Sequence, residues 1–358
     1  MKKRELYLAA SLLCFVLCMC FTSCMRRELH LPTDEAKMVL VVHDTVATGV
    51  AGKGRYYQML SYDAESSALS SMSITSPDGG DVTLKPGHRH VIVARYDSDV
   101  VIIDGLEKWE SLHAYTRSMT SQTTQMFHKL AHNVMTKATP MLSEDEESVW
   151  AETTNTEVAW EPDWFFTSRM PDMYIPWRGT DDGIYTLYAD AYSTVRPGTI
   201  TVTGLGGKKN ILSLTAFLTG LNHGIYLSTG TPDWKQVTLA IPMVIGSDDE
   251  PSTTVFRTFG FLPAAVAKAK ADIAKGPSVE AEELPESRNL LFLLVTDTGG
   301  GSYLFTYDVT DQCLESEDKL VVDIDIDLDF DVPVPEKGGG GLQPVMIDWE
   351  EVHYIINL

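Results

Sequence analysis

Short runs of β-branched and aromatic residues, separated by glycine, proline, aspartate and asparagine, fill most of the chain after residue 37. Such runs predict strands, and the residues between them predict turns. In the first half they recur roughly every ten residues, a spacing typical of antiparallel sheets packed as a sandwich. We expect one helix here, at 123–137, and strands at 38–44, 55–62, 68–75, 81–85, 90–96 and 99–103.

The same pattern returns in the second half. Strands are expected at 184–191, 198–204, 212–218, 224–228, 236–244, 252–261, 290–296, 302–309, 320–330 and 352–358. One stretch, 264–275, is rich in strong helix formers and stops at Gly276-Pro277, which predicts a surface helix.

The two halves are separated by residues 140–182, which carry an acidic run and no apolar periodicity. This composition predicts a linker between domains. We therefore expect an all-β chain of two tandem antiparallel β-sandwich domains, at 37–139 and 183–358, with one or two short inserted helices.

The first 24 residues have the three parts of an export signal. A basic start at residues 2–4 precedes an apolar run at 6–21 that is too short for a convincing membrane span. The run ends in Phe21-Thr22-Ser23-Cys24, which resembles a lipobox, the element that bacterial lipoprotein signal peptidase recognises. Of the four cysteines in this region, only Cys24 follows a small residue, so Cys24 is the predicted lipid-attachment site. Ordinary secretory cleavage and an uncleaved anchor helix are the alternatives.

Charge and lipid together predict how the chain meets a membrane. The net charge is -22, and removing the leader, whose charge is +2, leaves a still more acidic chain. Such a surface repels phosphate backbones and anionic headgroups, so nucleic acid is not an expected partner. Each buried acyl methylene contributes about 0.8 kcal/mol, so two or more acyl chains on Cys24 anchor the chain stably. Residues 25–36 form the expected tether, and the expected location is the outer membrane, exposed at the cell surface.

Residues 323–331 alternate aspartate with isoleucine, leucine and phenylalanine. Because successive side chains of a strand point to opposite faces, the five aspartates share one face. One interpretation is a ladder of calcium ligands. However, neighbouring aspartates on that face lie about 6.6 Å apart, whereas calcium needs oxygens from several segments at about 2.3–2.6 Å. We therefore favour a half-buried strand whose charged outer face discourages pairing at a sheet edge.

The other candidate sites have structural interpretations that we prefer. His88 and His90 share a strand face, and His128 and His132 share a helix face, but neither pair has an evident third metal ligand. Residues 203–209 are glycine-rich, yet the glycines are too close for a phosphate loop, so we expect a turn. Cys313 is the one cysteine of the body and is expected to be a small buried apolar residue.

Tryptophans offer a possible platform for sugars. There are seven, and those at positions 150, 160, 164 and 177 fall in the segment between the two halves. We expect these four to pack between domains instead. No catalytic residue, metal or cofactor is predicted, and an enzyme is the least supported class.

Several segments carry a resemblance to a known family. They are the start 24–27, the apolar first strand, the hairpin 77–87 leading to 91–96, and the segments 202–206, 305–310 and 347–352. In these the chain resembles the fimbrillin-like lipoproteins of Bacteroidales, more narrowly the fimbrial anchor and tip subunits and an allied uncharacterised lipoprotein family. The resemblance implies transthyretin-like sandwiches and a non-enzymatic part in fimbriae or adhesion.

The resemblance also implies a mode of assembly. Subunits of such pili join when a strand of one fills a groove in the next. The final run, 352–358, alternates apolar residues and is a candidate donor, although we expect it to complete its own domain. The alternative function is that of a glycan-binding surface lipoprotein.

Overall fold

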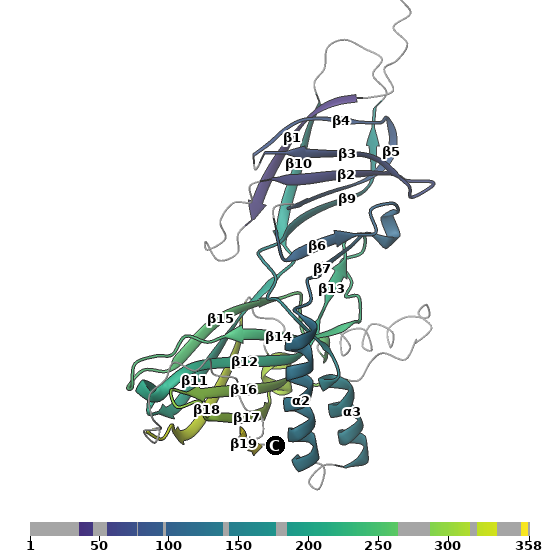
Figure 1. Ribbon diagram of the computed structural model, residues 1–358. Coiled ribbons are helices and arrows are strands. Elements are labelled where there is room, and N and C mark those ends of the chain that lie inside the picture. The colour runs from purple at the N-terminus through teal and green to yellow at the C-terminus, as the bar shows by residue number, and fades with distance from the viewer. Residues whose placement is uncertain are drawn as a thin grey trace, which may run out of the picture.

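The computed structural model describes residues 36–45, 56–76, 78–95, 98–138, 143–176, 185–263, 287–315, 321–334 and 352–356 (Figure 1). The helices are α2 (Ser121–Ala138), α3 (Glu144–Thr154) and α5 (Thr310–Glu315), with 3-10 turns η1 (Trp109–Ser111) and η3 (Lys208–Asn210). The strands are β1 (Ala36–Thr45), β2 (Tyr57–Asp63), β3 (Leu69–Thr75), β4 (Gly79–Leu84), β5 (Gly87–Arg95), β6 (Val101–Asp104), β7 (His113–Thr116), β8 (Glu157–Ala159), β9 (Phe166–Ile175), β10 (Tyr185–Ser193), β11 (Arg196–Gly206), β12 (Ile211–Asn222), β13 (Gly224–Tyr226), β14 (Gln236–Pro242), β15 (Ser252–Thr258), β16 (Leu290–Asp297), β17 (Ser302–Asp308), β18 (Val322–Asp331) and β19 (Val352–Ile356).

A seven-stranded sheet in the order β3-β2-β5-β9-β10-β1-β4 forms the upper part of Figure 1. Most neighbours are antiparallel, but β1 runs parallel to β10. Apolar residues from five of these strands gather into one buried cluster: Tyr57, Met59, Val82, Leu84, Val91, Val93, Phe166, Ile175, Leu187, Ala189 and Ala191. Burial of this shared face holds the sheet together.

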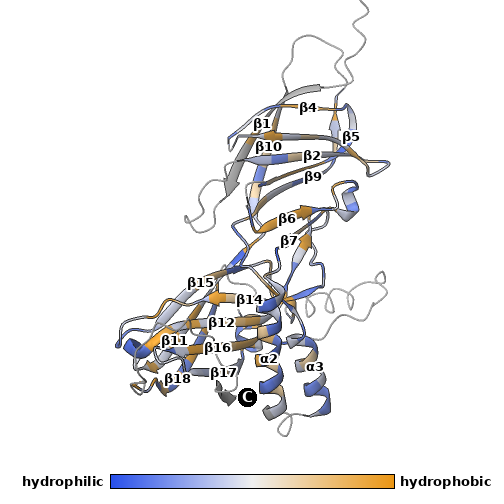
Figure 2. Cartoon of the chain, in the orientation of Figure 1, coloured by the Kyte–Doolittle hydropathy of each residue, from blue (hydrophilic) through white to orange (hydrophobic). Residues whose placement is uncertain are grey.

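Strands β2 and β5 are buried on both faces, so a second layer must cover them. Their other face contributes Leu60, Tyr62, Ile92 and Ala94 to a different cluster. That cluster is completed by a three-stranded sheet, β13-β7-β6, which we call the middle sheet, and by the adjoining loops. The hydrophobic colouring of β6 in Figure 2 agrees with this placement.

The lower part of Figure 1 has three layers. The outer sheet, β15-β11-β18, faces a six-stranded sheet, β19-β17-β16-β12-β14-β8, across the largest buried cluster. Alternate residues of β12 and β16, such as Phe217 and Phe292, point the other way and pack against Phe127 of α2 and Trp150 of α3. The helices therefore cover the second face of the six-stranded sheet.

Two contacts join the loop before β9 to the end of β15. Phe165 meets Phe259 edge-to-face, with ring centroids 6.4 Å apart. Arg257 Nε donates to Glu161 Oε1 at 2.6 Å. Burial raises the pKa of Glu161 above its usual range, although the Arg257 charge opposes that rise. An apolar and an ionic contact thus link the seven-stranded sheet to the lower layers.

The prediction of an all-β sandwich fold with a few helices is confirmed. The helix expected at 123–137 is present as α2, and nearly every expected strand lies within two or three residues of an observed one. The sheets are mostly antiparallel, as expected, but they also contain parallel pairs, which are β1–β10, β11–β18, β14–β8 and β17–β19. The helix expected at 264–275 lies outside the described residues.

The linker expected at 140–182 is wrong where the structure describes it. Its acidic run begins α3, where Ser143 and Glu146 cap each other's backbone N–H groups and four acidic residues occupy the first turn. Strands β8 and β9 follow. The predicted boundary at 183 falls between β9 and β10, two strands of the same sheet. The division of the chain into domains stays a prediction, but its boundaries do not coincide with those of the sheets.

Strand β18 matches the interpretation of the aspartate run as a half-buried strand. Val322, Ile324, Ile326 and Leu328 are buried, whereas the five aspartates are exposed. The strand pairs with β11 on one side and lies at the edge of the outer sheet, among the described strands. No helix in the described part of the chain combines the length and apolarity needed to cross a membrane.

This alternation makes a testable prediction about stability. Ile324→Ala removes a fully buried side chain from the largest cluster, and we expect it to lower the free energy of unfolding by about 2–5 kcal/mol. Asp323→Ala, one residue away on the exposed face, should change it little. Urea unfolding followed by circular dichroism measures both variants. Equal losses would contradict the assignment of faces.

Candidate functional site

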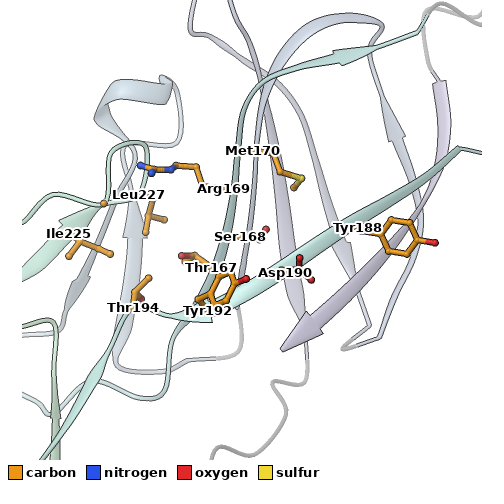
Figure 3. Close-up of a pocket in the computed structure, with 11 residues that line it drawn as sticks. Thr167, Ser168, Arg169, Met170, Tyr188, Asp190, Tyr192, Thr194, Ile225 and Leu227 are labelled. Carbon is orange, nitrogen blue, oxygen red and sulfur yellow. The ribbon is translucent and has the colours of Figure 1, made fainter. Parts of the chain in front are cut away.

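A cavity of about 500 Å³ opens where β9 and β10 meet the turn after β13 (Figure 3). It lies between the seven-stranded sheet and the middle sheet. Its lining is Thr167, Ser168, Arg169, Met170, Tyr188, Asp190, Tyr192, Thr194, Ile225, Leu227 and Gly230. We call it the waist cavity.

The alternation of β10 places one polar and two aromatic side chains along one wall. Leu187, Ala189 and Ala191 point into the core of the seven-stranded sheet, so the residues between them point outward. Tyr188 and Tyr192 are 63% and 58% exposed, an unusual state for large aromatic side chains. Figure 3 shows them in a row along the strand with Asp190 between them.

The opposite wall is the turn after β13, and Arg169 holds it in place. Arg169 Nη1 donates to the Ser228 carbonyl oxygen at 2.8 Å, linking β9 to the turn. Within the turn, the Gly230 N–H donates to the Tyr226 carbonyl at 2.7 Å. Gly230 has a φ of +77°, a conformation that glycine adopts at no steric cost. The two walls are therefore fixed relative to each other.

This arrangement suits binding rather than cleavage. Exposed tyrosine rings present flat faces on which an apolar ring surface can stack, and the neighbouring carboxylate and hydroxyl groups can hydrogen-bond to polar substituents. Among the described residues that line the cavity, Asp190 is the one carboxylate. Glycoside hydrolysis generally needs two carboxylates on either side of the bond. The described lining thus offers flat aromatic faces and hydrogen-bonding groups, with one carboxylate among them.

The predicted histidine pair on β5 serves a structural purpose. His88 Nδ1 lies 2.9 Å from Asp172 Oδ1, and His90 Nδ1 accepts a hydrogen bond from the Asp172 N–H, also at 2.9 Å. His90 also stacks on Trp109, with centroids 4.9 Å apart. Asp172 has a φ of +51°, so both rings support a left-handed residue in β9.

The second predicted pair lies on α2, beside a hollow of about 370 Å³ between α2 and α3. His128 Nε2 donates to the Thr156 carbonyl at 2.8 Å, whereas His132 is exposed. Because the His128 ring donates this hydrogen bond to a carbonyl of the neighbouring segment, we interpret His128 as a packing residue rather than a metal ligand.

The remaining predicted residues are scattered. Cys24 lies outside the described residues. Cys313 is 1% exposed and belongs to the largest cluster, and its pKa is raised by burial and by the charge of Asp308. The glycine-rich segment 203–209 ends β11 and begins η3, as the predicted turn requires. Trp150 of α3 is buried in the core, Trp164 packs against the cluster of the seven-stranded sheet, and Trp160 is 48% exposed, so these three do not share one interface. Trp177, the fourth, lies outside the described residues.

A cluster that no sequence pattern indicated lies on the middle sheet. His113 Nε2 and His223 Nδ1 each lie 3.0 Å from Asp233 Oδ2. The side chains of Asp233 and His223 are 5% and 7% exposed. Burial raises the pKa of Asp233, but hydrogen bonds and charge from the two histidines outweigh it and hold that pKa below its usual range. His113 and Asp233 are 120 residues apart in the sequence, so no short sequence motif predicts the cluster.

Comparison with known proteins places the chain among uncharacterised relatives. The model of a family described as a domain of unknown function, DUF5119, matches residues 23–242. No curated protein matches the chain.

Several solved structures are similar to it. A protein from Bacteroides ovatus, described as a candidate adhesin, aligns with a TM-score of 0.56 at 18% identity, over 88% of this chain and 98% of its own. The fimbrial anchor protein Mfa2 from Porphyromonas gingivalis aligns with a TM-score of 0.43 at 13% identity, over 82% and 90% of the two chains. The tip fimbrial protein Mfa3 from the same organism aligns at 0.30 and 12%, over 75% and 81%.

Proposed function

The chain belongs to the DUF5119 family, and from that premise we propose that it is a lipid-anchored, non-enzymatic protein of the cell envelope that serves adhesion as a subunit of a fimbria-like assembly. The observation that carries the proposal is the fold. It is shared over nearly the full length of both chains with the candidate adhesin of Bacteroides ovatus.

The architecture supports a structural rather than a catalytic role. Among the described residues, the lining of the waist cavity holds one carboxylate, Asp190, rather than a pair. Cys313, the one cysteine among the described residues, is buried with a raised pKa, which argues against thiol catalysis by this residue. A thiol in that state is a poor nucleophile.

Lipid on Cys24 is the proposed link to the membrane. The support comes from the sequence: an export signal that ends in a small residue followed by cysteine. With a net charge of -22, the chain gains no electrostatic attraction from anionic headgroups. Attachment would then depend on acyl chains, and the outer membrane with exposure at the cell surface is the proposed location.

Growing cells labelled with a radioactive fatty acid test the anchor. We expect label on the wild-type chain and on Cys20→Ala, and none on Cys24→Ala. Cys20 is the matched control because it lies in the same leader but follows a bulky methionine. An unlabelled wild-type chain, or label that persists in Cys24→Ala, would contradict the proposed anchor.

Partner capture tests the fimbrial part. The full chain, cross-linked on intact cells of its native bacterium and purified in detergent, should bring down at least one other secreted β-sandwich subunit. Association by strand addition predicts that the partnership resists high salt, because main-chain hydrogen bonds carry it. Recovery of the chain alone would count against an assembly subunit.

A second function is favoured by the waist cavity. Two tyrosines that are more than half exposed, with Asp190 between them, match the requirements of a carbohydrate-binding surface. We propose glycan binding as the alternative, and it is compatible with adhesion because many adhesive surfaces recognise sugars.

Affinity electrophoresis against a panel of polysaccharides tests this alternative. The double variant Tyr188→Ala, Tyr192→Ala should lose at least about tenfold in affinity, which corresponds to about 1.4 kcal/mol. The control is Tyr174→Ala, because that ring is equally exposed, at 57%, but does not line the cavity. Equal losses in both variants, or binding by neither the variants nor the wild-type chain, would rule the cavity out as a glycan site.

A further inference from the structure

We infer that His113, His223 and Asp233 form a binding site for a divalent transition-metal cation of the Zn²⁺ type. Three separate segments supply the ligands: β7, the junction of β12 and β13, and the loop after β13. The candidate ligand atoms of the three residues all lie within 4.8 Å of one another.

The spacing fits a tetrahedral ion. Zn²⁺ binds imidazole nitrogen and carboxylate oxygen at about 2.0–2.2 Å, so ligands around it lie about 3.4 Å apart. Both nitrogen–oxygen distances in the cluster are 3.0 Å. An ion therefore enters after the two nitrogens move a few tenths of an ångström away from Asp233 Oδ2 and settle about 3.4 Å from each other, from a separation of at most 4.8 Å. Two nitrogens and one oxygen favour zinc and its neighbours over calcium, which prefers oxygen ligands.

Neighbouring residues orient the three candidate ligands. Tyr115 stacks on His223 with centroids 4.8 Å apart, and Tyr226 stacks on His113 at 5.1 Å. The Lys235 N–H donates to Asp233 Oδ1 at 3.2 Å, which leaves Oδ2 directed at the two rings. Ligands oriented in advance by their neighbours bind a metal with less loss of side-chain freedom.

A glycine allows the strands that carry these residues to approach. Gly224 lies opposite Tyr115 in the pairing of β13 with β7. A Cβ at this position would lie 2.2 Å from the Ala114 carbonyl oxygen. The close approach brings Tyr115 against His223 and sets the angle at which the histidine meets Asp233.

The site also has an open side. His113 is 19% exposed, whereas Asp233 and His223 are almost fully buried. A cation would enter beside His113, and water would complete its shell there, as at zinc sites with three protein ligands. Binding exchanges the two contacts at Asp233 Oδ2 for three bonds to the metal. A nitrogen that binds the metal carries no hydrogen, so the hydrogen that each ring donates to Asp233 Oδ2 is released to solvent on binding, and each bound ring keeps one hydrogen on its other nitrogen.

Titration of ZnCl₂ into the metal-stripped full chain in detergent, followed by calorimetry, tests the site. We expect one equivalent to bind with a Kd in the micromolar range or tighter, and the melting temperature to rise because the cation binds the folded state. Co²⁺ in its place should give the visible absorption of a four-coordinate ion. A wild-type chain that binds neither cation would overturn the inference.

Variants locate the binding. Removing a residue that hydrogen-bonds to a metal ligand typically lowers metal affinity about 10–100-fold. His223→Ala removes a ligand itself, so we expect it to lower the affinity at least about 100-fold. If His223→Ala fails to fold, Asp233→Asn and His113→Gln replace it as test variants, because they roughly preserve side-chain volume. We expect both to lower the metal affinity. His128→Ala, which alters a histidine of α2 away from the cluster, should bind as the wild type does. Affinity that is unchanged in the cluster variants, or equally reduced in His128→Ala, would show that the cation binds elsewhere.

Discussion

Strands that are buried on both faces determine how the layers of this protein are stacked. In β2, β5, β12 and β16, successive residues enter different apolar clusters, so each strand needs a covering layer on both sides. Backbone groups in such strands are satisfied by their neighbours in the sheet, and each buried apolar side chain contributes about 1.5–3 kcal/mol. For β12 and β16 the second cover is the helix pair α2 and α3. For β2 and β5 it is the middle sheet, and removal of that sheet would expose Leu60, Tyr62, Ile92 and Ala94 together.

The middle sheet therefore contributes residues both to the core and to the two candidate sites. Adjacent residues of β13 point to opposite faces: Ile225 enters the cluster shared with β2 and lines the waist cavity, whereas Tyr226 stacks on His113. A ligand in the cavity and a cation in the histidine cluster would therefore contact opposite faces of the same strand. A cation that stiffens β13 would also fix the turn that Arg169 holds as the far wall of the cavity. Any coupling between the two proposed sites would therefore pass through β13, whose ends adjoin His223 and the turn of the cavity.

The sequence predicted local structure well and long-range arrangement poorly, for reasons that particular elements make clear. In β18 apolar residues and aspartates alternate along the sequence, so both the strand and its exposed aspartates were predictable from the sequence. Strand β9 was missed because its Arg169-Met-Pro-Asp172 segment breaks the apolar alternation, and its partners β5 and β10 lie on opposite sides of it in the chain. Helix α3 was taken for a linker because its signal is a capping box and an acidic first turn rather than an apolar stripe. The histidine cluster depends on the pairing of β7 with β13, which no local pattern reveals.

The same reasoning explains why function is harder to predict here than fold. A sandwich requires little more than apolar residues at alternate positions, and β10 meets that requirement with Leu187, Ala189 and Ala191 alone. The positions between them are free to vary without cost to the core, and it is there that Tyr188, Asp190 and Tyr192 are found. Tyr188 and Tyr192 are more than half exposed, so they gain little from burial in the free protein. A carbohydrate ring that stacked on them would cover both side chains, and this is the physical basis of the glycan site proposed for the exposed face of β10.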